Sequence, residues 1–302
     1  MPKLNRVVVK APAKVNLSLQ VGAVQHDGFH PLETIFQAVD LCDDVIAEVG
    51  AGLSLTVEGV NADQVGAPEK NLAWQAASLL ADSAGIKPNV HLHIVKRIPV
   101  AGGMAGGSAD AAGALVACDA LWGLQTPREN LLDLAAELGS DVPFSVVGGT
   151  ALGRGRGEQL TTVLTRGEFH WVFATSELGL STPDVYRMFD ELNPDPMSPK
   201  IDDALLSGLA TGDVAAVGKL LNNNLQDAAI RMRGSLRRVL DAGLGAGAIG
   251  AVVSGSGPTC AFLAKSADHA TNIAVELSAT GLVSRTLQAS GPTRGATVVS
   301  VD

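Results

Sequence analysis

The stretch PVAGGMAGGSADAA, residues 99–112, constrains the fold more than any other part of the chain. It places two glycine pairs between a strand-like segment at 89–100 and a helix-like segment at 108–124. Glycine loses more backbone entropy on folding than any other residue, so a loop this rich in glycine needs a reason. Glycines let backbone N–H groups face a ligand, and the positive end of the following helix favours an anion. The pattern predicts a phosphate-binding loop, with a tight strand-to-helix turn as the alternative.

Two well-known kinds of phosphate loop do not fit this stretch. A Walker loop ends in a lysine followed by Ser or Thr, and AGGSAD contains no lysine. A dinucleotide fingerprint needs a parallel strand after the helix, ending in an acidic residue. Here a second helix is expected at 126–139, opened by a capping box with Thr126 as N-cap and Glu129 three positions later. A glycine-rich phosphate loop of another type is therefore the leading interpretation.

The segment 7–21 reads as a strand whose two faces differ in polarity. From Ala13 onward, apolar residues alternate with polar ones, so Lys14 and Asn16 lie side by side on the polar face. On the residues alone, this is a solvated strand face. Further along, SDVPFSVVGGTALGRGRGE at 140–158 is expected to form a turn and a pair of strands. The character of the sequence changes near 160–170, where we expect a domain boundary.

Composition excludes some classes of function. Hydrophobic residues make up 46% and charged residues 18% of the chain, which predicts a packed core. The net charge of −9 argues against a broad nucleic-acid surface, because phosphate neutralisation needs clustered Lys and Arg. Three widely spaced cysteines give no disulfide framework and suit a reducing cytoplasm. The N-terminal segment resembles neither a signal peptide nor a membrane anchor, so we expect a cytoplasmic protein without nucleic-acid or membrane partners.

The glycine loop resembles the phosphate loop of the GHMP kinase superfamily, named for galactokinase, homoserine, mevalonate and phosphomevalonate kinases. Other segments match in the right order and span nearly the whole chain; they are APAKVNLSLQV, DGFHPLETIFQAVDL, LGSDVPF, GRGE, STPDVY and SGSGPT. Each segment alone is weak, whereas the ordered set is specific. The nearest branch acts on a cytidine diphosphate-linked methylerythritol in the non-mevalonate isoprenoid pathway.

The resemblance implies a fold and an activity. The fold is α+β with two domains: an N-terminal domain, 1–165, that resembles a ribosomal protein domain and carries the ATP phosphate loop, and a C-terminal ferredoxin-like domain, 166–302. The active site lies in the cleft between them. The implied activity is transfer of the γ-phosphoryl group of ATP to an alcohol, with Mg²⁺ arriving with ATP, in a monomer or homodimer.

Carried over residue by residue, the resemblance makes Asp141 the catalytic aspartate, Lys14 the lysine beside it and Asn16 a neighbouring substrate-binding residue. A carboxylate can accept the proton of an attacking hydroxyl, and a nearby ammonium can keep that carboxylate ionised. From the residues alone, Asp141 would instead be a turn or N-cap residue before Pro143.

The remaining implied site residues divide between two ligands. The ATP-binding set is Asn71, Leu72, Lys96, Pro99, Gly102, Gly103, Gly106, Gly107 and Ser108. The cytidine set is Phe29, His30, Thr182 and Tyr186, because an aromatic pair can enclose a pyrimidine while a histidine bonds its edge. The alternatives are a helix N-cap at Asn71, a solvated strand lysine at Lys96, and core aromatics at Phe29 and Tyr186. The SGSGPT segment is expected to pack against the loop and the diphosphate, or to be a plain turn.

Some positions depart from the family pattern. Met104, Ala105 and Ala109 replace a leucine, a glycine and a serine of the usual loop. Because Ala109 lacks a hydroxyl that could contact phosphate or magnesium, we assign no protein metal ligand. His91 and His93 share one strand face, which without a third ligand is better explained as a plain strand face. Asn224 stands where the family commonly has Asp, and we interpret it as structural.

Two alternative functions remain. A sibling kinase for mevalonate or homoserine would share the loop and the fold but should lack the cytidine set. A binding protein is the other class, because the N-terminal domain resembles a ribosomal protein domain, although the acidic composition and the phosphate loop argue against an RNA role.

Overall fold

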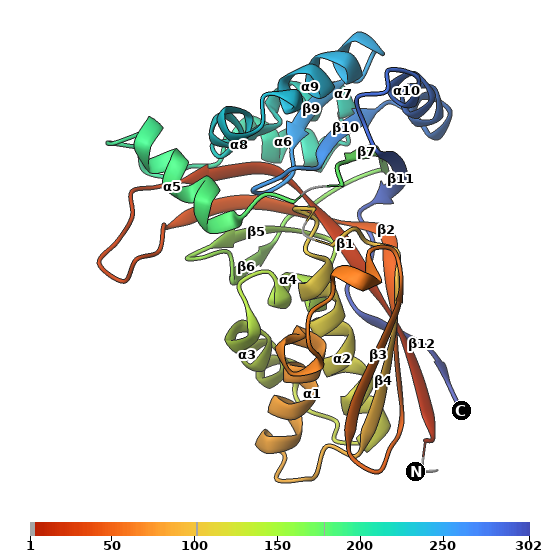
Figure 1. Ribbon diagram of the computed structural model, residues 1–302. Helices are drawn as coiled ribbons and strands as arrows, with labels where there is room; N and C mark the ends of the chain where they lie inside the picture. Colours follow the sequence, from red (N-terminus) through yellow and green to blue (C-terminus); the bar gives the residue numbers. More distant parts are fainter. Residues whose placement is uncertain (1–3, 101, 178) are drawn as a thin grey trace.

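The computed structural model of the chain describes residues 4–100, 102–177 and 179–302. Among them, two β-sheets divide the molecule, with one group of helices against each (Figure 1). The first sheet has the order β12-β1-β2-β4-β3, with β5 on β2, β6 on β5 and β8 on β1. Its strands are β1 (Arg6–Val21), β2 (Leu32–Val49), β3 (Leu53–Gly59), β4 (Val90–Lys96), β5 (Thr150–Arg154), β6 (Gln159–Thr162), β8 (Asn222–Asn223) and β12 (Thr297–Val301).

The second sheet is antiparallel throughout and has the order β11-β7-β10-β9. Its strands are β7 (Phe169–Thr175), β9 (Gly250–Val253), β10 (Cys260–Ala264) and β11 (Arg285–Gly291). The chain changes sheet between β6 and β7, and its last strand, β12, returns to pair with β1. The boundary proposed at 165/166 falls in this change of sheet and stays a prediction.

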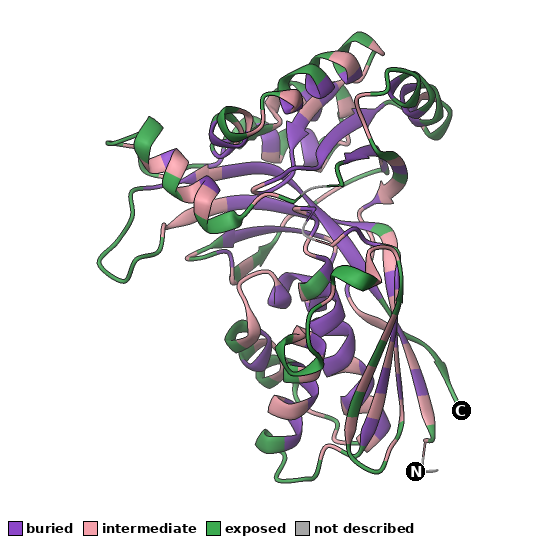
Figure 2. Cartoon of the chain, viewed as in Figure 1, coloured by how far each residue is buried: buried purple, intermediate pink, exposed green. Residues whose placement is uncertain are grey.

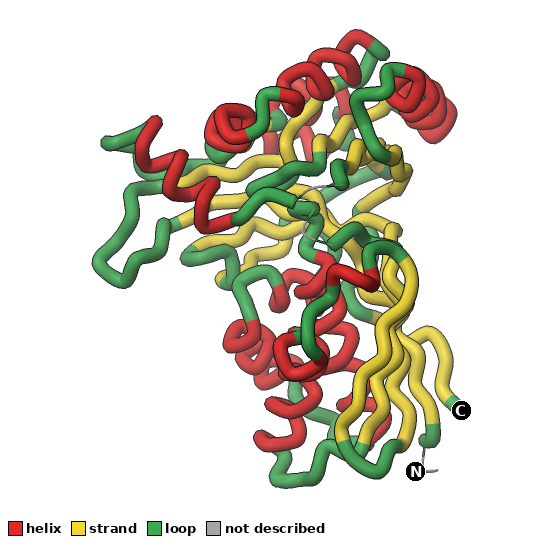
Figure 3. Tube along the Cα trace, in the orientation of Figure 1, coloured by secondary structure: helices red, strands yellow, loops and turns green. Residues whose placement is uncertain are grey.

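The helices form two groups, which the tube view separates clearly (Figure 3). With the first sheet lie α1 (Leu72–Ser83), α2 (Gly106–Trp122), α3 (Arg128–Leu138) and α4 (Val142–Val147), and the short 3₁₀ turns η1 (Ala62–Gln64) and η2 (Pro68–Lys70). With the second lie α5 (Thr182–Leu192), α6 (Asp203–Thr211), α7 (Val214–Leu220), α8 (Gln226–Met232), α9 (Ser235–Gly245) and α10 (Ala267–Ala279). No helix in the described ranges is long and apolar enough to cross a membrane.

Helix α2 is the centre of the first core. It packs against β1, β2, α1 and α4, and most of its residues are buried (Figure 2). The contact with the sheet is so close that a Cβ added at Gly113 would lie 2.6 Å from Val45 Cγ2. Small side chains in α2 therefore bring its backbone near the sheet, which fixes where the helix begins relative to β1.

Three local expectations are wrong. The polar face of β1 is buried, with Lys14 at 5% and Asn16 at 2% exposure, because the C-terminal part of the chain covers it. Residues 142–147 form helix α4, which Pro143 helps to start with its fixed φ. Helix α3 has Pro127 as N-cap and no side-chain cap, because proline has no side-chain acceptor; the Thr126 amide donates to Asp119 in α2.

Candidate active site

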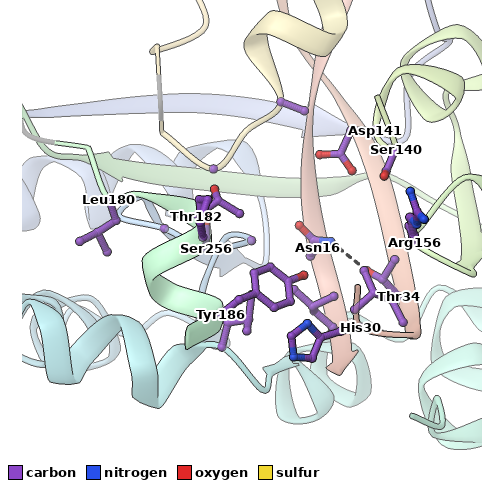
Figure 4. Close-up of a pocket in the computed structure, with 18 of the residues that line it drawn as sticks. Asn16, His30, Thr34, Ser140, Asp141, Arg156, Leu180, Thr182, Tyr186 and Ser256 are labelled. Atoms are coloured by element: carbon purple, nitrogen blue, oxygen red, sulfur yellow. Dashed lines mark hydrogen bonds between the residues drawn. The ribbon is translucent and has the colours of Figure 1, made fainter. Parts of the chain in front are cut away.

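A cleft of about 770 Å³ lies where the two halves of the molecule meet. It is walled by β1, the turn after β1, the glycine loop, the residues before α4, the start of α5 and the turn between β9 and β10. In Figure 4, Asp141 and Ser140 lie across the cleft from Tyr186 and His30, with Asn16 and Thr34 between them. The predicted site residues that line it are Lys14, Asn16, Phe29, His30, Gly102, Gly103, Gly106, Gly107, Ser108, Asp141, Thr182 and Tyr186.

Lys14 and Asp141 meet in this cleft. Lys14 Nζ lies 3.4 Å from Asp141 Oδ2 and donates to Asn16 Oδ1 at 2.6 Å. Asn16 Nδ2 donates in turn to Thr34 Oγ1 at 2.8 Å. A buried ammonium is stable only when it is paired and hydrogen-bonded, so this chain of contacts fixes the position of the lysine.

Asp141 is the residue before α4, but its carboxylate makes no capping hydrogen bond to that helix. Its side chain is 34% exposed, which leaves the carboxylate open to the cleft. Its negative charge also reaches Tyr186: burial raises the pKa of the Tyr186 phenol, and the charge of Asp141 raises it further. A carboxylate that faces an open cleft, beside an ammonium, can accept a proton from a bound hydroxyl.

The glycine loop leads into α2, which begins at Gly106, two residues before the expected start. The N-cap, Ala105, has a left-handed backbone with φ +58° and makes no side-chain cap. The first amides of a helix have no intrahelical acceptor, and here Gly106, Gly107 and Ser108 line the cleft. The loop therefore turns unsatisfied N–H groups and the positive end of α2 toward the cleft.

The turn between β9 and β10, within SGSGPT, packs against this loop. Ser254 Oγ donates to the carbonyl of Gly103 at 2.9 Å, and a Cβ at Gly103 would collide with the Ser254 carbonyl. Gly255 lies beside Asn16 and Lys14, since a Cβ built on it would be 3.6 Å from Asn16 Oδ1 and 3.7 Å from Lys14 Nζ. The predicted packing of SGSGPT on the loop is confirmed.

The residues after β1 and those of α5 form an aromatic end of the cleft. The His30 and Tyr186 rings lie 5.0 Å apart at 36°, and His30 Nε2 bonds Asp190 Oδ1 at 2.7 Å. Phe29 is 49% exposed, so it is not a core aromatic. Thr182 Oγ1 bonds Ser256 Oγ at 2.8 Å, which ties α5 to the SGSGPT turn.

Comparisons with known proteins bear on the whole chain. The model of the GHMP kinases N terminal domain matches residues 71–149, and that of the GHMP kinases C terminal domain matches 205–282. A 4-diphosphocytidyl-2-C-methyl-D-erythritol kinase of Thermobifida fusca is 54% identical over 97% of this chain and 98% of that protein. The chain belongs to the GHMP kinase family.

Solved structures agree with this assignment. A crystal structure of a 4-(cytidine 5'-diphospho)-2C-methyl-D-erythritol kinase is 33% identical, covers 94% of this chain and 98% of its own, and superimposes with a TM-score of 0.79. A homoserine kinase from Cytophaga hutchinsonii, 20% identical over 98% of both chains with a TM-score of 0.75, shares the fold. The expected α+β GHMP kinase fold is confirmed. This GHMP kinase is a small-molecule kinase that uses ATP.

Four residues assigned to ATP do not line the cleft of this GHMP kinase. Asn71 is the N-cap of α1, with Oδ1 accepting the Ala73 amide at 2.8 Å. Leu72 and Pro99 lie beside the loop glycines, next to Gly107 and Gly102 respectively. Lys96 is buried, so the interpretation of a solvated strand lysine is wrong. The ATP-binding roles of these four residues stay predictions.

The two histidines on β4 bond the neighbouring strand β3. His91 contacts Ser54 and Thr56, and His93 Nε2 lies 3.3 Å from Glu58 Oε1. No group of three or more His, Cys, Asp or Glu residues in the described ranges could hold a metal ion. Asn224 accepts the Val21 amide at 2.9 Å through Oδ1, which confirms its structural role.

Other residues of the cleft were not singled out from the sequence. Arg156, in the turn after β5, donates to Asp27 at 3.0 Å, and its guanidinium carbon lies 3.5 Å from the centre of the Phe29 ring. Arg156 stands in the quoted segment GRGE, so a signal for it existed. Thr34 and Asp190 carry no local sequence signal. Only their contacts with Asn16 and His30 show that they belong to the site.

Proposed function

We infer that this GHMP kinase transfers the γ-phosphoryl group of ATP to the 2-hydroxyl of 4-diphosphocytidyl-2-C-methyl-D-erythritol, in the non-mevalonate route to isoprenoid precursors. The observation that carries this function is that one cleft contains the glycine loop, the Lys14–Asp141 pair and the aromatic end with His30 and Tyr186. The full-length relatives that bear this activity in their names support it.

The glycine loop holds the donor in this proposal. Its N–H groups and the N-terminus of α2 face the triphosphate, and the turn at Gly255 lies next to Lys14 and Asn16. Mg²⁺ enters as part of Mg–ATP, and we assign it no protein ligand. Phosphoryl transfer needs little covalent help from the protein, so positioning and charge supply most of the catalysis.

The oxygen of the substrate hydroxyl bonds to the γ-phosphorus while the bond from that phosphorus to the ADP oxygen breaks. Asp141 accepts the proton that the hydroxyl loses. Lys14, 3.4 Å away, offsets the charge that develops on the transferred group. Asn16 holds the lysine and lies at the cleft surface, where it can orient the hydroxyl. The products are the 2-phosphate and ADP.

The aromatic end of the cleft takes the cytidine. Phe29 and Tyr186 offer ring faces to the pyrimidine, and His30, oriented by Asp190, offers a ring nitrogen to its edge. Thr182 lies between this end and the SGSGPT turn, where a ribose or diphosphate would pass. We further propose a cytoplasmic location, which the three free cysteines suit, and a monomer or homodimer.

The decisive experiment measures phosphoryl transfer from ATP to four alcohols: 4-diphosphocytidyl-methylerythritol, free methylerythritol, mevalonate and homoserine. We expect turnover only with the cytidylated compound, because the aromatic end gives binding energy to the base. Equal or faster turnover of mevalonate or homoserine would assign the protein to a sibling activity. Stabilisation against heat by RNA but not by ATP analogue or cytidine diphosphate would instead favour a binding protein.

A further inference from the structure

The Lys96 side chain lies beneath the glycine loop, outside the cleft. Lys96 is the last residue of β4, and its side chain is 2% exposed. Its Nζ donates to Asp43 Oδ2 at 2.5 Å and to Asp110 Oδ2 at 2.6 Å. Asp43 comes from β2 and Asp110 from α2, and both are buried. We call these three residues, Lys96, Asp43 and Asp110, the Lys96 triad.

The Lys96 triad holds both ends of the loop. Asp43 Oδ1 accepts the amides of Arg97 at 2.5 Å and Ile98 at 2.8 Å, the first two residues after β4. Asp110 belongs to the beginning of α2, where the chain leaves the loop. Because Lys96 bonds both carboxylates, the entry and the exit of the loop are tied together through one ammonium.

The loop rests directly on this ammonium. A Cβ added at Gly106 would lie 3.3 Å from Lys96 Nζ and 3.1 Å from Ile98 Cγ2. Gly106 also lines the cleft, so one residue separates the cation from the space where an anion would sit. The Lys96 triad thus supports the N-terminus of α2 from below, on the side of the loop away from the cleft.

Burying the three charged groups of the Lys96 triad costs free energy, so stability alone does not explain the triad. Buried ion pairs are often no more stable than well-packed apolar residues, whereas removing one partner from such a pair is strongly destabilising. The two carboxylates outnumber the ammonium, and within the described residues Asp110 Oδ1 is buried without a hydrogen-bond partner. Burial lowers the pKa of Lys96, but the charges of Asp110 and Asp43 more than offset this and raise it overall. The ammonium is offset by its two acidic partners, so the Lys96 triad supplies a fixed geometry under the loop and not a net positive charge.

We propose that Lys96, Asp43 and Asp110 are positioning residues for ATP, which hold the loop in its anion-binding form and act on the nucleotide through the loop without touching it. The inference rests on the proposed function only in assigning the loop to the ATP phosphates. In this proposal the Lys96 ammonium holds the loop in place by bonding Asp43 at its entry and Asp110 at its exit.

The test compares Asp110→Ala with Cys118→Ala, a variant in the same helix. Cys118 is fully buried more than three turns along α2 from Gly106, so its truncation lowers the stability of α2 without loosening the triad. We expect Asp110→Ala to raise the dissociation constant of an ATP analogue by roughly three- to thirtyfold, the range for residues that act through a contact network. The dissociation constant of cytidine diphosphate should stay within twofold, and Cys118→Ala should bind both ligands like the wild type.

Asp110→Asn is the conservative variant and guards against a folding failure of Asp110→Ala. Its amide oxygen can still accept from Lys96, so it should keep more of the ATP affinity than Asp110→Ala. In turnover assays, the KM for ATP should rise in step with the loss of affinity, whereas kcat at saturating ATP should change little. A folded Asp110→Ala that binds the analogue within twofold of the wild type overturns the proposal, as does an equal loss in Cys118→Ala. A wild-type protein that binds ATP analogue without phosphorylating the cytidylated substrate would contradict the proposed function alone.

Discussion

Lys14 Nζ lies 3.4 Å from Asp141 Oδ2, although one residue comes from β1 and the other from the turn before α4. The contact exists because the short helix α4 packs against α2 and β1 and brings Asp141 over the strand. The backbone amide of Lys14 also donates to the carbonyl of Met104, in the glycine loop, at 3.2 Å. A single strand residue thereby connects the proposed proton acceptor with the proposed phosphate site.

Tyr186 offers a test of cytidine recognition. Tyr186→Ala should weaken binding of cytidine diphosphate by roughly 1–3 kcal/mol, because one base–aromatic stack is lost. The affinity for ATP analogue should hardly change, which calorimetric titration of both ligands would establish. Phe189→Leu is the matched control, since Phe189 is buried beside His30 without lining the cleft. An equal loss of both ligands in Tyr186→Ala, with a lower Tm, would instead mark Tyr186 as a core aromatic.

Gly107 tests whether the loop binds phosphate. A Cβ added there meets only Leu72 Cδ1, at 3.7 Å, so Gly107→Val should fold with nearly unchanged Tm. Its side chain would occupy space at the cleft, and we expect ATP affinity to fall by roughly tenfold or more because the backbone amides are no longer reachable. Gly113→Ala should behave in the opposite way, losing stability against Val45 while keeping ATP affinity. Normal ATP binding by Gly107→Val would reduce the loop to a turn.

The pH dependence of stability should carry the signature of Asp110. Burial raises the pKa of this carboxyl from 3.8 to about 8, with Lys96 lowering it and Asp43 raising it. Between these two values the folded protein holds a proton that the unfolded chain has released, so this group makes the free energy of unfolding fall as pH rises. Asp110→Asn lacks the titration. Chemical denaturation from pH 4 to 8 should therefore show the variant gaining stability relative to the wild type, and parallel curves would contradict the shift.

Much of the site was predictable from the sequence because its signals are local. The glycine pairs, the order of the family segments and the positions of Asp141 and Tyr186 follow from short stretches, and the cleft contains these residues. The burial of Lys14 and Asn16 was not predictable, because the alternation of apolar and polar residues describes a single strand and does not show which other part of the chain covers it. The partners of Lys96 are likewise not local: Asp43 lies on β2 and Asp110 on α2, and only the fold brings them to the lysine.

The loop positions that differ from the family pattern also show what could not be predicted from the sequence. Ala105 replaces a glycine of the usual family loop, and the structure places it at φ +58°, where a Cβ is disfavoured. The sequence shows the alanine at position 105, but it does not reveal the backbone conformation there. Conversely, Gly106 and Gly107 lie in α2 and have ordinary helical backbones, so their lack of a side chain, and not a special φ, explains them.

The coupling of Lys14 and Asp141 predicts non-additive effects. Lys14→Met removes the charge next to the carboxylate and leaves Asn16 without its donor, so turnover should fall strongly. The double variant Lys14→Met, Asp141→Asn should lose less activity than the product of the two single losses, since residues in contact do not act independently. Rates of the wild type, both single variants and the double variant complete the cycle. Strict multiplication of the losses would show that the two residues act separately.

Asp141→Asn tests the proposed chemistry most directly. This change keeps the shape of the side chain and removes its basic oxygen, while the loop and the aromatic end are untouched. Single-turnover rates with ATP and 4-diphosphocytidyl-methylerythritol should fall by roughly 10²–10⁴-fold, the usual cost of losing a general base. Equilibrium binding of both substrates should remain near that of the wild type, so that the loss appears in kcat. A folded Asp141→Asn protein with near-normal single-turnover rates would remove Asp141 from the chemistry and contradict the mechanism.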